Sequence, residues 1–87
     1  MLIKPSTRSG KKYMAVFASG KTVHFGDSNY EDFTTHRDPM RKRNYLARHS
    51  NEDWTNPYSA GTLSRYILWN LPTIKASYAD YKKRFNI

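Results

Sequence analysis

The stretch that decides the fold runs from Trp54 to Asn70 and reads WTNPYSAGTLSRYILWN. It holds both tryptophans and the densest apolar cluster of the chain. Ser59 suits the N-cap of a helix, because its hydroxyl can accept from the free amides of the first turn. Apolar residues follow at helical spacing and leave more than one side of the helix apolar. We therefore expect a central, buried helix over residues 59–70, ended by Asn70 and Pro72.

The first 26 residues carry the pattern of a β-hairpin or of a three-stranded antiparallel meander. Two runs rich in β-formers, residues 13–18 and 21–25, are separated by the turn signal Ser19-Gly20. With a two-residue loop, the core face would hold Met14, Val16, Val23 and Phe25, and the other face Tyr13, Ala15, Phe17 and His24. A longer loop with a bulge would shift this register. Residues 2–3 could add the third strand that a marginal hairpin needs.

Two further helices are expected around the central one. Asp38-Pro39 signals a helix start, because aspartate caps well and proline suits the first helical position; this helix covers residues 38–50. Thr73 caps a last helix over residues 73–85, whose apolar stripe is Ile74, Tyr78, Tyr81 and Phe85. Residues 30–35 fit either a short strand or a single helical turn. The sequence thus predicts one small α+β domain over residues 1–87, with three helices after the hairpin region.

The chain is strongly basic, with fifteen Lys and Arg against seven Asp and Glu, a formal net charge of +8 and a pI of about 9.9. Such a surface attracts polyanions: nucleic acid, anionic lipid heads or acidic protein faces. The absence of cysteine excludes a disulfide framework and a thiolate metal site. The N-terminal residues are too few and too polar for a signal peptide, and no apolar run approaches the roughly 20 residues of a membrane span.

No pattern typical of catalysis is present. The three histidines, His24, His36 and His49, lack the spacing of metal ligands. His24 with Asp27 and His36 with Asp38 could be drawn as a nuclease-type metal site, but the helix from Asp38 carries only His49, near its end. No serine lies in a nucleophile elbow, and the glycines form no phosphate-binding loop. We therefore expect no enzyme activity, no metal and no cofactor.

Basic and aromatic side chains together indicate a binding role. The predicted polyanion- or partner-binding residues are Lys11, Lys12, Lys21, Arg37, Arg41, Lys42, Arg43, Arg48, Lys82, Lys83 and Arg84. Tyr13, Phe17 and Tyr45 could stack on bases, although the two hairpin rings could instead pack on a helix. Arg65, within the apolar helix, should pair with a carboxylate such as Asp53 or Asp80, or project to a partner.

Motifs along most of the chain, from about Lys12 to Phe85, resemble a family of small uncharacterised basic proteins of nucleocytoplasmic large DNA viruses, which infect algae and protists. The residues that carry the resemblance are Lys12-Tyr13, His24-Phe25-Gly26, Asp32-Phe33-Thr34, His36-Arg37-Asp38-Pro39, Tyr45-Leu46-Ala47-Arg48-His49, Trp54, Pro57, Ala60-Gly61, Ser64-Arg65, Leu68-Trp69-Asn70, Pro72-Thr73 and Tyr81-Lys82-Lys83-Arg84-Phe85. This resemblance implies no established activity. It implies a context: a protein made without secretion, in the host cytoplasm or a viral factory, and carried in the virion.

Charge and context together lead to one expectation and two alternatives. We expect a non-enzymatic, virion-associated protein, a minor capsid or structural component that docks on acidic surfaces of neighbouring capsid proteins. The first alternative is a DNA-binding protein that contacts phosphates without sequence specificity. The second and more remote alternative is a small metal-dependent nuclease.

Overall fold

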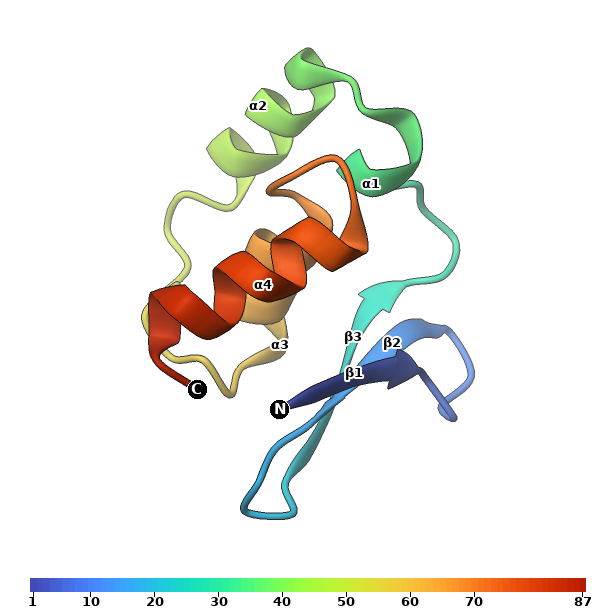
Figure 1. Cartoon of the computed structure of the whole chain (residues 1–87). Coiled ribbons are helices and arrows are strands. Elements are labelled where there is room, and N and C mark those ends of the chain that lie inside the picture. The colour runs from blue at the N-terminus through green and yellow to red at the C-terminus, as the bar shows by residue number, and fades with distance from the viewer.

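Three antiparallel strands at the N-terminus form a sheet, and helices follow in the rest of the chain (Figure 1). The structure is a computed structural model that describes residues 1–87. The strands β1 (Leu2–Pro5), β2 (Lys11–Val16) and β3 (Thr22–Asp27) pair in the order β1-β2-β3. This arrangement confirms the α+β class and the three-stranded form of the predicted meander.

A three-residue loop closes the β2–β3 hairpin, rather than the predicted two-residue loop. The N–H of Phe17 donates to the carbonyl of Lys21 at 2.9 Å, and Gly20 adopts a φ of +91°. A three-residue loop with glycine in the left-handed region is a common hairpin geometry. The register is therefore shifted by one residue, and the observed pairs include Tyr13 with Phe25, Met14 with His24, Ala15 with Val23 and Val16 with Thr22.

The shifted register turns the opposite face of β2 toward the core, because side chains alternate along a strand. Ala15 and Phe17 are buried, with 0% and 5% of their surface exposed. Met14 and Val16, which the sequence placed in the core, lie on the other face. The predicted core face of β2 was therefore wrong, whereas Phe25 on β3 is fully buried as expected.

Two helices follow the sheet. Residues 30–35 resolve as a helical turn rather than a strand: α1 (Phe33–His36) begins at Asp32, whose carboxylate accepts from the N–H of Thr34 at 2.9 Å. The next helix, α2 (Pro39–Arg48), is capped by Asp38, which accepts from the amides of the first turn. Its start and extent confirm the helix predicted over residues 38–50.

The central helix begins as predicted, but its second half is a π-helical turn. Ser59 caps α3 (Ala60–Leu63) by accepting from the N–H of Thr62 at 3.1 Å. The chain continues directly into η1 (Ser64–Leu68), where the N–H of Trp69 donates five residues back to the carbonyl of Ser64 at 3.1 Å. The helix therefore ends at Leu68, so the end predicted at Asn70 was two residues too far. π-turns are rare and concentrate at functional sites.

The last helix, α4 (Ile74–Phe85), is capped by Thr73 as predicted and packs on η1. Figure 1 shows α3 and α4 between the sheet and α2. The core joins the sheet to these helices and consists of Ala15, Phe17, Phe25, Leu63, Ile67, Leu68 and Tyr81. The central helix is thus buried, as the sequence predicted. None of the helices has both the length and the apolar character that crossing a bilayer requires.

Candidate functional site

Every Asp and Glu carboxylate of the chain has a hydrogen-bond or ion-pair partner within the chain. Four carboxylates accept hydrogen bonds within turns and helix caps: Asp27, Asp32, Asp38 and Asp53. Glu31 and Glu52 pair with Arg41 and His49. Asp80 accepts from the side-chain amide of Asn70 at 2.8 Å and pairs with Arg84 at 3.3 Å. Asp27, Asp38 and Asp53 accept from neutral amides and keep their charge, so the net charge of the folded chain stays that of the sequence, +8.

Most of the cations have no carboxylate partner. Three of the fifteen Lys and Arg side chains, Lys12, Arg41 and Arg84, lie within 4 Å of a carboxylate oxygen, and the other twelve do not. The Arg41–Glu31 pair is long, at 3.9 Å, and both side chains are about half exposed. Such exposed pairs contribute little. The positive charge of the sequence is therefore retained on the folded surface.

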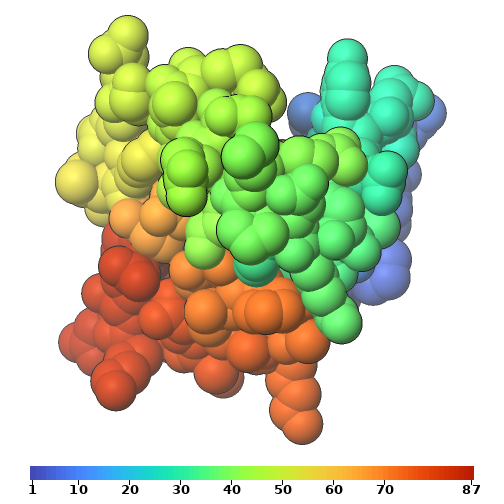
Figure 2. Space-filling model, turned by 90° about the horizontal axis from the view of Figure 1, so that it is seen from above, coloured from blue at the N-terminus to red at the C-terminus, as the bar shows by residue number.

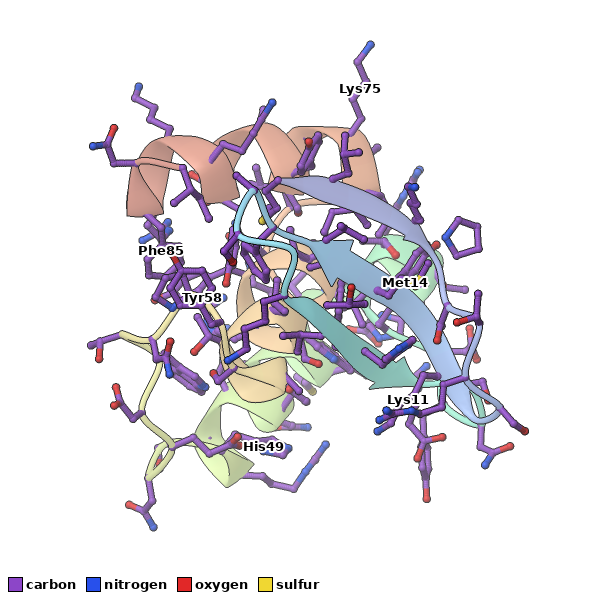
Figure 3. The ribbon with its side chains drawn as sticks, turned by 90° about the horizontal axis from the view of Figure 1, so that it is seen from below. Lys11, Met14, His49, Tyr58, Lys75 and Phe85 are labelled. Carbon is purple, nitrogen blue, oxygen red and sulfur yellow. The ribbon has the colours of Figure 1, made fainter.

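The predicted binding residues do not form a single track. Arg41, Arg43 and Arg48 are exposed on α2, and Lys82 and Lys83 are exposed on the C-terminal turn of α4. Lys21 lies in the hairpin loop, at the end of the molecule away from α2 (Figure 1). Figure 3 shows Lys11 and Lys75 projecting in opposite directions. The structure thus distributes the cations over several faces.

Lys42 is one predicted binding residue that the fold uses itself. Its ammonium donates to the carbonyl of Asn70 at 2.6 Å and lies 4.9 Å from the centre of the Phe33 ring. Burial, together with the nearby charge of Arg65, lowers the pKa of Lys42. This lysine ties α2 to the segment after η1, so its assignment to the binding surface is corrected.

The three predicted stacking residues are all occupied by the fold. Phe17 is buried, with its ring 4.7 Å from that of Tyr58. Tyr13 packs against the core, 6.1 Å from Phe25. Tyr45 lies 4.2 Å from Trp69 in a parallel stack at 3°, and 4.2 Å from His49. Neither face of the Tyr45 ring is free and Phe17 is buried, so stacking on a base is wrong for these two residues, whereas Phe17 and Tyr13 follow the alternative of packing inside the fold.

Arg65 makes no ion pair, contrary to the predicted pairing with Asp53 or Asp80. Its guanidinium donates to the carbonyl of Trp69 at 3.0 Å and lies over the rings of Trp54 and Tyr66, at 5.3 and 4.6 Å. Burial lowers the pKa of Arg65. Arginine is suited to this position, because its flat cation both stacks on rings and caps a carbonyl.

The histidines do not form the nuclease-type pairs that could be drawn from the sequence. His24 pairs with the hydroxyl of Ser6 at 2.7 Å, and His36 accepts from the backbone N–H of Asp38 at 2.9 Å. His49 pairs with Glu52. No group of three or more His, Cys, Asp or Glu side chains is arranged to hold a metal ion.

A cleft of about 630 Å³ lies between the sheet and α2. One wall is α2, which contributes Arg41, Asn44, Tyr45 and Arg48. The opposite wall is the end of β3 and the loop after it, including Tyr30 and Glu31, with Lys11 and Lys12 from β2. The back is formed by α3 and η1, with Gly61, Ser64 and Leu68. Figure 2 shows this hollow between α2, in yellow-green, and the teal segment that follows β3.

Two glycines of the cleft lining have close neighbours where a Cβ would lie. A Cβ on Gly61 would lie 2.8 Å from a carboxylate oxygen of Glu52, so glycine lets that side chain approach the start of α3. A Cβ on Gly26 would lie 2.7 Å from the Cδ1 atom of Leu68, and Gly26 has a φ of +83°. Gly26 therefore requires glycine for its backbone conformation and for space against the buried Leu68, whereas the exposed side chain of Glu52 can move away from a Cβ at Gly61.

The predictions from sequence missed this cleft. Tyr30, Asn44, Glu52, Ser64 and Trp69 line it and were not among the predicted site residues. Part of the signal was present: Arg41, Asn44, Tyr45 and Arg48 follow at helical spacing and share one face of α2. The opposite wall comes from a loop whose position depends on the sheet, so no local pattern could locate it.

The model of a family of unknown function, DUF5754, matches residues 1–49 of the 87. The chain belongs to this family. The matched segment contains the sheet, α1 and α2, and therefore two of the three walls of the cleft. No curated protein and no solved structure matches the chain.

Proposed function

We propose that this member of DUF5754 is a non-enzymatic structural component of the particle of a large DNA virus, which docks on acidic surfaces of neighbouring capsid proteins. The observation that carries the proposal is the imbalance of free charge. Twelve of the fifteen Lys and Arg side chains have no carboxylate partner, and the net charge of the chain is +8. The viral context comes from the resemblance of the sequence motifs.

The distribution of the cations supports a protein partner. A protein that follows one nucleic-acid strand gathers its cations along one groove or face. Here Lys21, Arg43 and Lys83 belong to the hairpin loop, α2 and α4, which face different directions. Cations on several sides suit a small module held between more than one acidic neighbour.

Exposed apolar side chains beside the cations also support protein docking. Met40, at the start of α2, is 62% exposed, and Leu71 is 36% exposed. The segment after η1 lies beside α1 and α2, because Lys42 of α2 donates to Asn70, and Arg37, at the end of α1, donates to Pro72 at 3.3 Å. Apolar side chains within a charged rim are typical of protein interfaces.

The test is the release of the protein from purified particles. Docking on acidic protein surfaces predicts that salt releases the protein from opened particles, because the distance over which exposed charges attract falls from about 10 Å at 0.1 M salt to about 3 Å at 1 M. Nuclease should not release it. A Lys82→Gln/Lys83→Gln variant should be released at lower salt. The charge-conserving variant Lys82→Arg/Lys83→Arg should behave like the natural chain.

Nucleic-acid binding remains the second candidate, because the cations of α2 border a cleft with an exposed ring. Tyr30 is 71% exposed at that cleft, which Arg41 and Arg48 also line. This function predicts release by nuclease, and binding to DNA that weakens with salt as a power law in the number of phosphate contacts. Retention after nuclease treatment, combined with release by salt, would favour capsid docking.

A further inference from the structure

The cleft between α2 and the end of β3 has the size and chemistry of a small-ligand site. Its volume of about 630 Å³ lies within the range of roughly 300–1,000 Å³ that ligand pockets occupy. The docking proposal does not depend on it, since Lys21, Arg43 and Lys83 lie outside the cleft. What the cleft would bind therefore has to be inferred from its own residues.

The charges in the cleft are balanced, and this narrows the class of ligand. Four cations and four carboxylates line it, in contrast to the excess of cations on the whole surface. Lys12 and Asp32 are mutually satisfied, with 2.6 Å between the ammonium and the carboxylate. Carboxylates would repel a ligand that is anionic throughout. A ligand with one anionic group and a polar body that donates hydrogen bonds suits such walls.

Two cations of the cleft have no carboxylate partner, Lys11 on β2 and Arg48 on α2, and the two arginines of the cleft both lie on α2. Arg48 has no carboxylate partner, and the long Arg41–Glu31 contact of 3.9 Å leaves most donors of Arg41 available. These two arginines stand two helical turns apart on one face, about 10 Å along the axis. A guanidinium binds phosphate oxygens through two parallel hydrogen bonds, so this wall suits a phosphate.

One aromatic ring is available for stacking. The Tyr45 ring is held between Trp69 and His49. Tyr30, on the opposite wall, is 71% exposed, and no other ring packs on it. An exposed tyrosine across from two arginines suits a ligand that joins a flat, polar ring to a phosphate.

We propose that this cleft binds a nucleotide unit, with its phosphate at Arg48 and Arg41 and its base against Tyr30. The unit could come from a free mononucleotide or from one residue of a single strand, and both present the same base and phosphate. Asn44 and Ser64 supply polar side chains along the walls, and the carboxylates can accept from a base amine or a ribose hydroxyl.

The experiment measures binding by titration calorimetry with four probes: adenosine monophosphate, adenosine, inorganic phosphate and a short deoxyadenosine oligonucleotide. Arg48→Gln should weaken binding of the monophosphate about ten-fold, because it removes a charged hydrogen-bonding partner. Tyr30→Ala should weaken it about five-fold or more through lost stacking. Arg43→Gln is the matched control: it removes the same charge from α2 but lies outside the cleft.

The results distinguish a free nucleotide from a residue of a single strand as the ligand, and a site in the cleft from attraction to the basic surface as a whole. Binding of the monophosphate, weakened by Arg48→Gln and Tyr30→Ala but not by Arg43→Gln, supports the site with a free nucleotide as ligand. Binding of the oligonucleotide alone, with the same ranking of variants, supports it with a strand as ligand. The proposal is overturned by equal loss in Arg43→Gln, by phosphate binding as tightly as the monophosphate, or by no binding of any probe. Release from particles does not depend on Tyr30, so failure here leaves the docking proposal standing.

Discussion

Replacing Asp32 tests the contact that holds the wall of the cleft to the sheet. Asp32 is 3% exposed and has two roles. It caps α1 through the N–H of Thr34, and it pairs with the ammonium of Lys12 on β2 at 2.6 Å. Asp32→Ala removes both roles at once and leaves Lys12 without its partner.

The magnitude follows from the two contacts. Loss of an N-cap costs about 1 kcal/mol. Breaking a fully buried pair costs roughly 3–5 kcal/mol, but the Lys12 side chain is 20% exposed and can turn toward water, so about 1–2 kcal/mol is expected here. The sum is about 2–3 kcal/mol, a large part of the roughly 5–15 kcal/mol available to a small domain.

Urea unfolding followed by tryptophan fluorescence measures this loss. Glu31→Ala is the matched control, because it removes the same charge from the neighbouring residue, whose side chain is 59% exposed and whose ion pair is long. It should change the free energy of unfolding by less than about 0.5 kcal/mol. A double-mutant cycle with Lys12→Ala should show coupling between the two positions of about 1 kcal/mol or more.

A loss of stability in Asp32→Ala no larger than that in Glu31→Ala would contradict these roles of Asp32. A double-mutant cycle without coupling between Lys12 and Asp32 would contradict them as well. Either result would mean that the ion pair does not join the loop after β3 to β2.

Two further predictions concern the backbone at the cleft and the buried tyrosines. Gly26→Ala should lower the free energy of unfolding by about 2 kcal/mol in the same urea assay, because Gly26 has a φ of +83° and the new methyl would lie 2.7 Å from Leu68. Gly20→Ala is the control, because Gly20 has a φ of +91° and nothing lies within 4 Å of the new methyl. It should cost about 1 kcal/mol, from backbone strain alone. Burial raises the pKa of Tyr45 to about 12 and raises that of Tyr81 as well. An unfolded tyrosine releases its proton near pH 10, whereas these two retain theirs in the folded protein, so stability should fall as the pH rises from about 10 toward 12. Unfolding curves across this range check the sign, and a stability that rises with pH would contradict it.

The helix starts were predictable from sequence because capping is local. Ser59, Asp38 and Thr73 each accept from an amide two or three residues ahead, so the residues involved are neighbours in the chain. The same holds for the core stripe of α4, where periodicity identified Tyr81, which is fully buried. These features need no information about the rest of the fold.

The hairpin register was not predictable in this way, because both faces of β2 carry apolar residues. Met14 and Val16 on one face compete with Ala15 and Phe17 on the other, and the alternation alone cannot choose between them. The choice was made by the Gly20 loop and by the helices that cover one face of the sheet.

The sequence by itself determined the α+β class, the order of the main elements, the N-caps of three helices and the excess of positive charge, since each depends on composition or on residues a few positions apart. Only the tertiary structure decided the partners of Arg65, the π-turn before Trp69 and the burial of Phe17. It also decided the cleft, whose walls come from segments far apart in the chain. The physical reason is the separation along the chain of the residues that interact. Capping and periodicity involve residues within one or two turns, whereas packing and the pairing of charges depend on which distant segments meet in space.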